Sequence, residues 1–257
     1  MKNLFIVFIA LFTLIACKNK NDHNDIVVLC GASMRAPMEE IKKQYESISG
    51  DKILMNYGGS GELCTQIKLS GDGDVFVAHD PFVPWAEEQG LLDKSSTIGY
   101  LNIVIVVPKK SEISSFNDLT KPGIRLGIGD TTYSTSGQVV KNALKNAPFG
   151  NAIMSNVVAQ SKGHQTRCNY IINGALDAGI VWNAVAETFR DKLKIIPVPE
   201  KYIDSITSAT YQESDLNNIK VAVGITEKAK NDPAVNKFYD FMISNGKNVF
   251  EKYGFLK

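Results

Sequence analysis

The sequence predicts an α/β protein with two lobes, each a mostly parallel sheet wrapped by helices, and a ligand cleft between the lobes. Short apolar, β-branched runs alternate with stretches of helical spacing along most of the chain. Glycine- and serine-rich turns separate them. A late apolar run, residues 219–225, follows the second group of elements and is a candidate return strand. We therefore expect the chain to leave the first lobe, build the second and come back.

The N-terminus has the pattern of a secretory signal. Lys2 precedes an apolar run, residues 4–15, that is too short to span a membrane. The run ends in Leu14-Ile15-Ala16-Cys17, which resembles the bacterial lipobox. We expect residues 1–16 to be a signal peptide, Cys17 to be lipidated, and polar residues 17–25 to form a flexible tether.

Charge argues against a nucleic-acid partner. The chain has 28 basic and 27 acidic residues, and residues 1–16 hold one lysine and no acid, so 27 of each remain after cleavage. A balanced chain offers no basic surface for nucleic acid or for an anionic membrane face. We expect membrane contact through the lipid anchor alone.

Three cysteines remain besides Cys17, namely Cys30, Cys64 and Cys168. An odd number allows one disulfide at most, and the scattered spacing lacks the CxxC unit of a zinc or redox site. We expect at least one buried free thiol.

The first lobe is assigned to residues 26–103 together with 223–257. Its expected strands cover residues 26–30, 52–57 and 75–78, and its expected helices cover 37–48, 62–69 and 85–91. An apolar strand over residues 101–107 is long enough to cross between the lobes. One further helix is expected over residues 232–253.

The second lobe is assigned to residues 104–222. Its expected strands cover residues 124–128, 156–159, 178–182 and 195–198, with helices over 138–145 and about 166–173. Residues 116–119 open this unit.

Three turns end in a serine followed by a helix, at Ser33, Ser60 and Ser136. Each serine can cap its helix, and each helix start carries unpaired N–H groups and partial positive charge. In doubly wound sheets ligands bind where such helix starts converge. Three of them aimed at one cleft would hold an anion with neutral donors.

A series of motifs resembles the periplasmic molybdate-binding proteins of ABC importers, of the type II periplasmic solute-binding class. The motifs, in order, are Gly31-Ala32-Ser33, Tyr57-Gly58-Gly59-Ser60-Gly61, Asp74-Val75-Phe76-Val77, Val106-Val107-Pro108, Gly127-Ile128-Gly129-Asp130, Asn173 to Val181, and Lys252-Tyr253-Gly254-Phe255. They cover nearly the whole chain after residue 25.

The resemblance implies the periplasmic-binding-protein fold and an oxyanion, molybdate or tungstate, as ligand. It implies serine ligands at Ser33 and Ser60, a backbone donor at Ser136 and another on or beside His164. The family's tyrosine position is occupied by Trp182, whose indole donates but does not accept, so the pocket is reshaped.

Two side chains near the expected site have open roles. The His164 side chain is either charged at mildly acidic pH and attractive to an anion, or packed with its backbone alone near the ligand. Arg35 follows Ser33 and either contacts the ligand or is solvated.

Catalysis is not predicted, because the sequence has no GxSxG, HExxH, CxxC or Walker motif. No cofactor is expected, and no metal beyond that of a bound oxyanion. The expected partners are the small oxyanion and an ABC permease with its cytoplasmic ATPase, for a monomer lipid-anchored on the periplasmic or cell-surface side of a bacterial membrane. The alternative is a surface lipoprotein or adhesin of the same fold that binds a small carboxylate or a phosphorylated metabolite.

Overall fold

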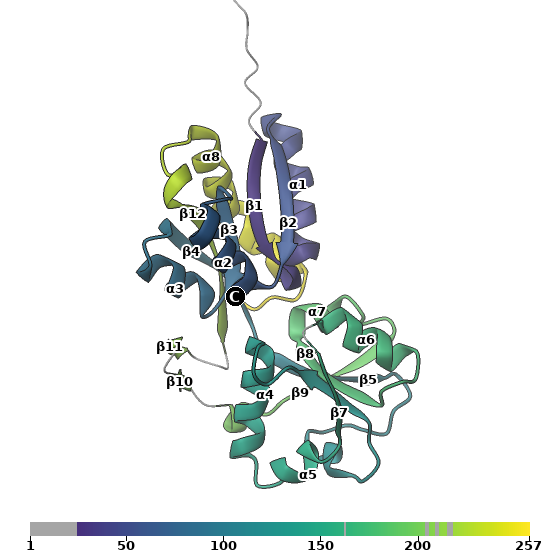
Figure 1. Cartoon of the computed structure of the whole chain (residues 1–257). Helices are drawn as coiled ribbons and strands as arrows, with labels where there is room; N and C mark the ends of the chain where they lie inside the picture. The colour runs from purple at the N-terminus through teal and green to yellow at the C-terminus, as the bar shows by residue number, and fades with distance from the viewer. Residues whose placement is uncertain (1–24, 162, 204–205, 209–210, 215–217) are drawn as a thin grey trace, which may run out of the picture.

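The structure is a computed structural model that describes residues 25–161, 163–203, 206–208, 211–214 and 218–257. Two five-stranded sheets, each covered by helices, lie one above the other (Figure 1). The predicted two-lobe α/β fold is confirmed. The predicted signal peptide, Cys17 and all but the last residue of the tether lie outside the described residues.

The first sheet has the strand order β2-β1-β3-β12-β4. Strands β2 (Lys52–Gly58), β1 (Asp25–Gly31) and β3 (Val75–His79) pair in parallel, whereas β12 (Ile219–Thr226) and β4 (Leu92–Leu101) pair antiparallel. The sheet is therefore mixed, with its parallel part built from the strand-helix alternation that the sequence shows. All of β12 belongs to this sheet.

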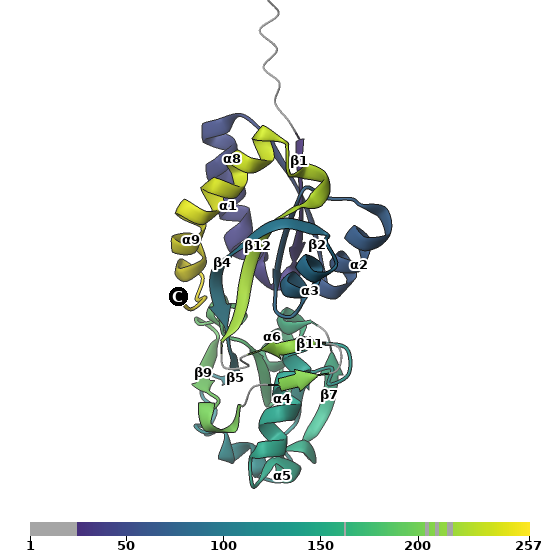
Figure 2. The same ribbon diagram turned by 90° about the vertical axis from the view of Figure 1, so that its left-hand side faces the viewer.

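The second sheet repeats the arrangement with the order β7-β6-β8-β5-β9. Strands β7 (Val157–Ser161), β6 (Leu126–Gly129) and β8 (Ala178–Trp182) are parallel, and β5 (Ile103–Pro108) and β9 (Leu193–Pro197) are antiparallel. A separate hairpin joins β10 (Ile206–Ser208) to β11 (Tyr211–Ser214). In both sheets the parallel strands end toward the other lobe (Figures 1 and 2).

Helices cover both sheets because each helix buries one apolar face against its sheet. In α1 (Arg35–Ser49) the buried side chains include Met38, Ile41 and Tyr45, which recur at helical spacing. The remaining α-helices are α2 (Ser60–Ser70), α3 (Phe82–Glu88), α4 (Thr135–Asn146), α5 (Gly150–Met154), α6 (His164–Ile172), α7 (Asn183–Glu187), α8 (Pro233–Phe241) and α9 (Lys247–Lys252).

The structure corrects two predicted elements. Residues 101–107 are not one strand, because β4 and β5 belong to different sheets and the chain changes sheet at Asn102. The side chain of Asn183 accepts a hydrogen bond from the Asn102 N–H at 3.0 Å and donates one to the carbonyl of Gly254 at 2.7 Å. Residues 232–253 are not one helix, because a π-helical turn (Met242–Gly246) that contains the weak helix formers Asn245 and Gly246 separates α8 from α9.

The three cysteines are buried and unpaired, which confirms the expected free thiol. Burial raises the pKa of Cys64 and of Cys168 to about 11 each, so both stay protonated at neutral pH. They act as small apolar core residues.

Candidate functional site

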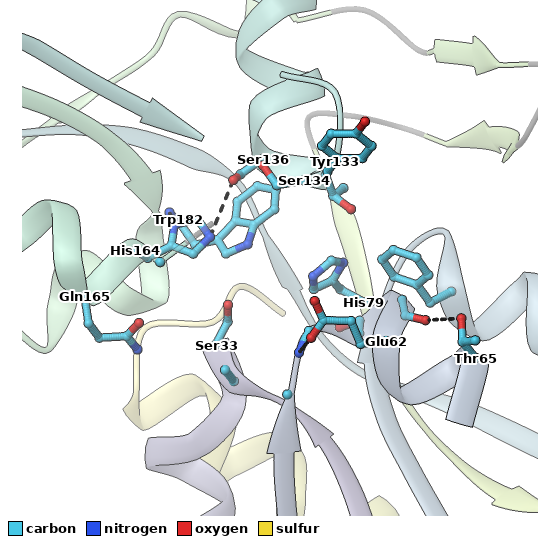
Figure 3. A pocket seen from close by; sticks show the side chains of 18 of the residues that line it. Ser33, Glu62, Thr65, His79, Tyr133, Ser134, Ser136, His164, Gln165 and Trp182 are labelled. Carbon is cyan, nitrogen blue, oxygen red and sulfur yellow. Dashed lines mark hydrogen bonds between the residues drawn. The ribbon is translucent and has the colours of Figure 1, made fainter. Parts of the chain in front are cut away.

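A cavity of about 420 Å³ lies between the carboxyl ends of the parallel strands of both sheets (Figure 3). Its first-lobe wall includes Ser33, Gly59, Ser60, Glu62, Thr65, His79 and Phe82, and its second-lobe wall includes Thr132, Tyr133, Ser134, Ser136, His164, Gln165 and Trp182. All five predicted ligand residues, Ser33, Ser60, Ser136, His164 and Trp182, lie on this wall. Arg35 is not among the lining residues.

The hydroxyls of the two first-lobe serines, Ser33 and Ser60, do not cap the helices near which they lie. Ser60 is the first residue of α2, and its N-cap is Gly59. Ser33 lies in a short 3-10 turn before α1, whose N-cap is Met34. Neither serine acts as the predicted cap, because the backbone enters each helix one residue away. Neither hydroxyl has a hydrogen bond to another described residue, so both remain available to a ligand.

The turn after β1 brings Ser60 close because Gly31 has no side chain. A Cβ on Gly31 would lie 2.6 Å from the Ser60 Oγ and 2.5 Å from the Met34 Cε. Glycine therefore allows the Ser60 side chain to pack over the end of β1.

Loop 130–134 shapes the second-lobe wall. The Asp130 carboxylate accepts hydrogen bonds from the N–H groups of Thr132 and Tyr133, both at 2.8 Å. Ser134 is the N-cap of α4 and accepts from the Gly137 N–H at 3.1 Å. The sequence suggested Ser136 as a cap of this helix, but Ser136 is the second residue of α4 and its buried side chain lies at the cavity.

His164 begins α6, and its ring stacks on Trp182 with centroids 5.6 Å apart. Its Nε2 lies 3.5 Å from the Ser136 Oγ. Burial lowers the pKa of His164 well below its ordinary value, and the charge of Arg167 and the nearby His79 lower it further. This direction favours a neutral ring and argues against the first of the two alternatives, a ring that charges at mildly acidic pH.

His79 ends β3 and faces Trp182 edge-on, with centroids 5.9 Å apart. Its Nδ1 lies 2.7 Å from the Asp80 carbonyl oxygen. A carbonyl accepts and does not donate, so Nδ1 carries the proton and Nε2 is an acceptor. Burial lowers the pKa of His79, which keeps the ring neutral. Its place at a strand end is the one feature of the sequence that points to this residue.

Glu62 and Arg35 contribute charge in ways that the sequence analysis did not foresee. The Glu62 carboxylate lines the cavity and accepts from the Gly59 N–H at 3.4 Å, which is one half of a capping box, because the glycine N-cap has no side chain to supply the other half. Arg35 stacks on the Tyr57 ring at 3.9 Å instead of entering the cavity. The Arg167 guanidinium lies behind His164, with its Nη2 2.9 Å from the His164 Nδ1.

A pair of α/β lobes with helix starts and neutral donors around one cleft defines a ligand-binding protein. The chain belongs to the bacterial extracellular solute-binding protein family, whose model matches residues 26–256. The family consists of binding proteins, so the chain is not an enzyme and takes its ligand without a cofactor. None of the described helices has the length and apolarity needed to cross a membrane.

Relatives confirm the predicted resemblance. The chain is 27% identical to a putative binding protein of Haemophilus influenzae, across 90% of this chain and 91% of the relative. It is 25% identical to the molybdate-binding protein ModA of Mycobacterium tuberculosis, across 90% of this chain and 84% of the relative. The periplasmic molybdate-binding protein of Azotobacter vinelandii shares the fold, with a TM-score of 0.73 and 16% identity over 90% of this chain and 99% of that one.

Proposed function

We propose that this chain is the solute-binding lipoprotein of an ABC importer and that it captures a tetrahedral oxyanion, molybdate or tungstate, between its lobes. The observation that carries the proposal is the composition of the cavity wall, which Ser33, Ser60 and Ser136 line from positions at or just before the starts of helices. Hydroxyl and backbone donors at helix N-termini stabilise an anion without a direct ion pair. The molybdate-binding relatives support the same ligand class.

The two lobes are proposed as the units that close on the ligand. The boundaries expected from the sequence, residues 26–103 with 223–257 and residues 104–222, move by a few residues in this proposal, because β5 begins at Ile103 and all of β12 belongs to the first sheet. The chain passes between the sheets at Asn102 and again before β12. A donor set divided between two bodies is complete when they approach, so the ligand stabilises the closed form.

A second candidate is a phosphorylated metabolite or small carboxylate, bound by a surface lipoprotein or adhesin of this fold. Two observations favour it. The cavity of about 420 Å³ offers more space than a four-oxygen anion fills. His79 Nε2 and the Glu62 carboxylate are acceptors, and an acceptor suits a ligand that carries a hydroxyl or an acidic proton.

Calorimetric titration of the purified protein separates the two candidates. The panel is molybdate, tungstate, sulfate, monohydrogen phosphate and a phosphorylated three-carbon acid. We expect molybdate and tungstate to bind most tightly, because a fully deprotonated dianion suits a wall dominated by donors. A clear preference for monohydrogen phosphate or the phosphorylated acid would assign the site to the second candidate.

A further inference from the structure

Arg167 is a buried cation one imidazole ring behind the cavity wall. Its side chain belongs to α6 and is 1% exposed. Burial lowers the pKa of Arg167 to about 10, which leaves the guanidinium charged at neutral pH. Within the described part of the chain, no Asp or Glu forms an ion pair with it. A buried charge without a counter-ion is unusual and calls for a functional reason.

We propose that Arg167 is a positioning residue of the anion site. It fixes the His164 ring in the tautomer that points an N–H toward the cavity, and it places an unpaired positive charge behind that ring. This inference rests on the proposed function, because it assigns Arg167 a role in holding the same oxyanion.

The tautomer follows from the two groups that contact His164 Nδ1. Arg167 Nη2 lies 2.9 Å from this nitrogen, and the Trp182 backbone N lies 3.3 Å from it. A guanidinium and a backbone N–H donate and never accept. Nδ1 must therefore accept, and in the neutral ring the proton is on Nε2.

The proton on Nε2 fixes which group donates in the contact between His164 and Ser136. Nε2 faces the Ser136 Oγ at 3.5 Å, so the serine oxygen accepts and its own hydroxyl hydrogen is free to point elsewhere. The serine hydroxyl can then donate to a ligand oxygen in the cavity, while the imidazole N–H donates to the serine oxygen from behind. In a low-dielectric wall such aligned donors polarise one another. Figure 3 shows the Ser136 and His164 side chains in contact at this wall.

The charge of Arg167 also favours an anion at the second-lobe wall. His164 stays neutral, so the positive charge near the ligand is that of Arg167. No described acid neutralises this charge, and an anion in the cavity would be its counter-ion across the His164 ring. The opposite wall is different, because the Glu62 carboxylate and the acceptor nitrogen of His79 belong to it. Arg167 therefore assigns the anionic part of the ligand to the second-lobe wall.

Arg167 also has a structural contact that the test must separate from this role. Its Nη1 donates to the carbonyl and to the Oγ of Ser161, at the end of β7. Loss of this contact alone would lower stability without changing the protonation of His164. A readout of the ring itself is therefore needed.

The direct test is ¹⁵N NMR of the His164 ring in the ligand-free protein, which needs no variant. We expect the shifts of the neutral Nε2–H tautomer across pH 6–8. A protonated Nδ1 or a charged ring in that range would overturn the proposal. The measurement is independent of ligand identity, so it stands apart from the panel that tests the proposed function.

The functional test compares Arg167→Met with Arg125→Met, using molybdate as the probe. Arg125 pairs with the exposed Asp177 at the opposite end of the same strands and serves as the matched loss of one positive charge. We expect Arg167→Met to weaken molybdate binding at least tenfold. The population of the Nδ1–H tautomer of His164 should also rise, because only the longer contact from the Trp182 N–H, at 3.3 Å, then holds Nδ1 as an acceptor. Arg125→Met should stay within about twofold, because exposed pairs contribute little.

Arg167→Lys covers the case in which Arg167→Met does not fold. Lysine keeps the charge and loses the planar fork, so we expect intermediate affinity. In a second background, His164→Gln replaces the ring with an amide donor that has no tautomer. Arg167→Lys should reduce molybdate affinity less in the His164→Gln background than in the wild type. The positioning role would be contradicted if Arg167→Lys reduced molybdate affinity equally in the wild-type and His164→Gln backgrounds. It would also be contradicted if Arg167→Lys and Arg167→Met both kept wild-type affinity.

Discussion

At the scale of single residues, the cavity wall contains hydroxyls whose roles differ according to their partners. Ser60 is 6% exposed and lies at the first turn of α2 with no hydrogen bond to a described residue. A hydroxyl that stabilises nothing in the protein contributes little to folding. Its removal should therefore change ligand binding much more than stability.

We expect Ser60→Ala to weaken oxyanion binding at least tenfold, since a hydrogen bond to a charged group is worth about 1.5 to 3 kcal/mol. Ser70→Ala is the matched control, because that hydroxyl bonds to the Gln66 carbonyl at the far end of the same helix. Circular dichroism should be the same for both variants. Affinity within a factor of about two of wild type for Ser60→Ala would remove Ser60 from the ligand set.

The buried histidines make stability depend on pH. Burial lowers the folded-state pKa of His79 and His164 below the ordinary 6.5, and Arg167 and His79 add to the effect at His164. The unfolded chain then binds more protons than the folded one below about pH 6.5, so stability is present above that pH and is lost as pH falls. Asp80, whose pKa burial raises, contributes in the opposite sense at lower pH.

Thermal unfolding at pH 7.5 and pH 5.0 should therefore show a lower melting temperature at pH 5.0. His164→Gln should show a smaller drop between the two pH values, because one buried base has been removed. An equal drop in wild type and variant would show that His164 titrates in the folded protein as an ordinary histidine.

At the scale of elements, the start of α4 places a capping serine and a cavity-lining serine within three residues of each other. Ser134 caps the helix through the Gly137 N–H, whereas Ser136 faces the cavity beside His164. Two neighbouring serines on one helix therefore have different consequences when mutated.

Ser134→Ala should lower the free energy of unfolding by about 1 kcal/mol, the usual cost of a lost cap. Ser136→Ala should lower stability less and weaken oxyanion binding more. Chemical denaturation and calorimetry on both variants check this crossed pattern. If both variants lost stability and affinity in the same proportion, the division of labour at this helix start would be wrong.

Elements could be predicted where one periodicity dominates. Strands β1, β2, β3 and β8 follow apolar runs that end in turns, and α1 follows a regular apolar stripe. The break at Asn102 was missed because an apolar run continues through it, and which sheet each half joins depends on tertiary pairing. Helices α5 and α7 have five residues each, too few to show a period.

The candidate site was predictable to the extent that it follows strand ends. Ser33, Ser60, His164 and Trp182 each lie at or within three residues of such an end, and Ser136 follows β6 after loop 130–134. The structure brings all five to one cavity. His79 and Arg167 were missed because their roles depend on burial and on contacts that the sequence does not contain. The spacing of His164 and Arg167, three residues apart on one helix, was the available signal.

At the scale of the whole molecule, a lipid anchor would hold the protein at the membrane in which the proposed importer lies. We expect Cys17 to be acylated, because the quartet Leu14-Ile15-Ala16-Cys17 suits a lipoprotein peptidase. Metabolic labelling with a palmitate analogue should tag the wild type and not Cys17→Ala. Equal labelling of the two proteins would mean that the anchor lies elsewhere.

The central claim is that a tetrahedral oxyanion binds between the two lobes. Crystals of the protein grown with tungstate test it most directly, because tungsten gives a strong anomalous signal that locates the ion without assumptions. We predict one strong anomalous peak in the cavity. The oxygens of the bound tungstate should lie within hydrogen-bond distance of the Ser60 hydroxyl on one wall and of the Ser136 hydroxyl on the other. A cavity without tungsten at saturating tungstate, or a tungsten site outside it, would contradict the account.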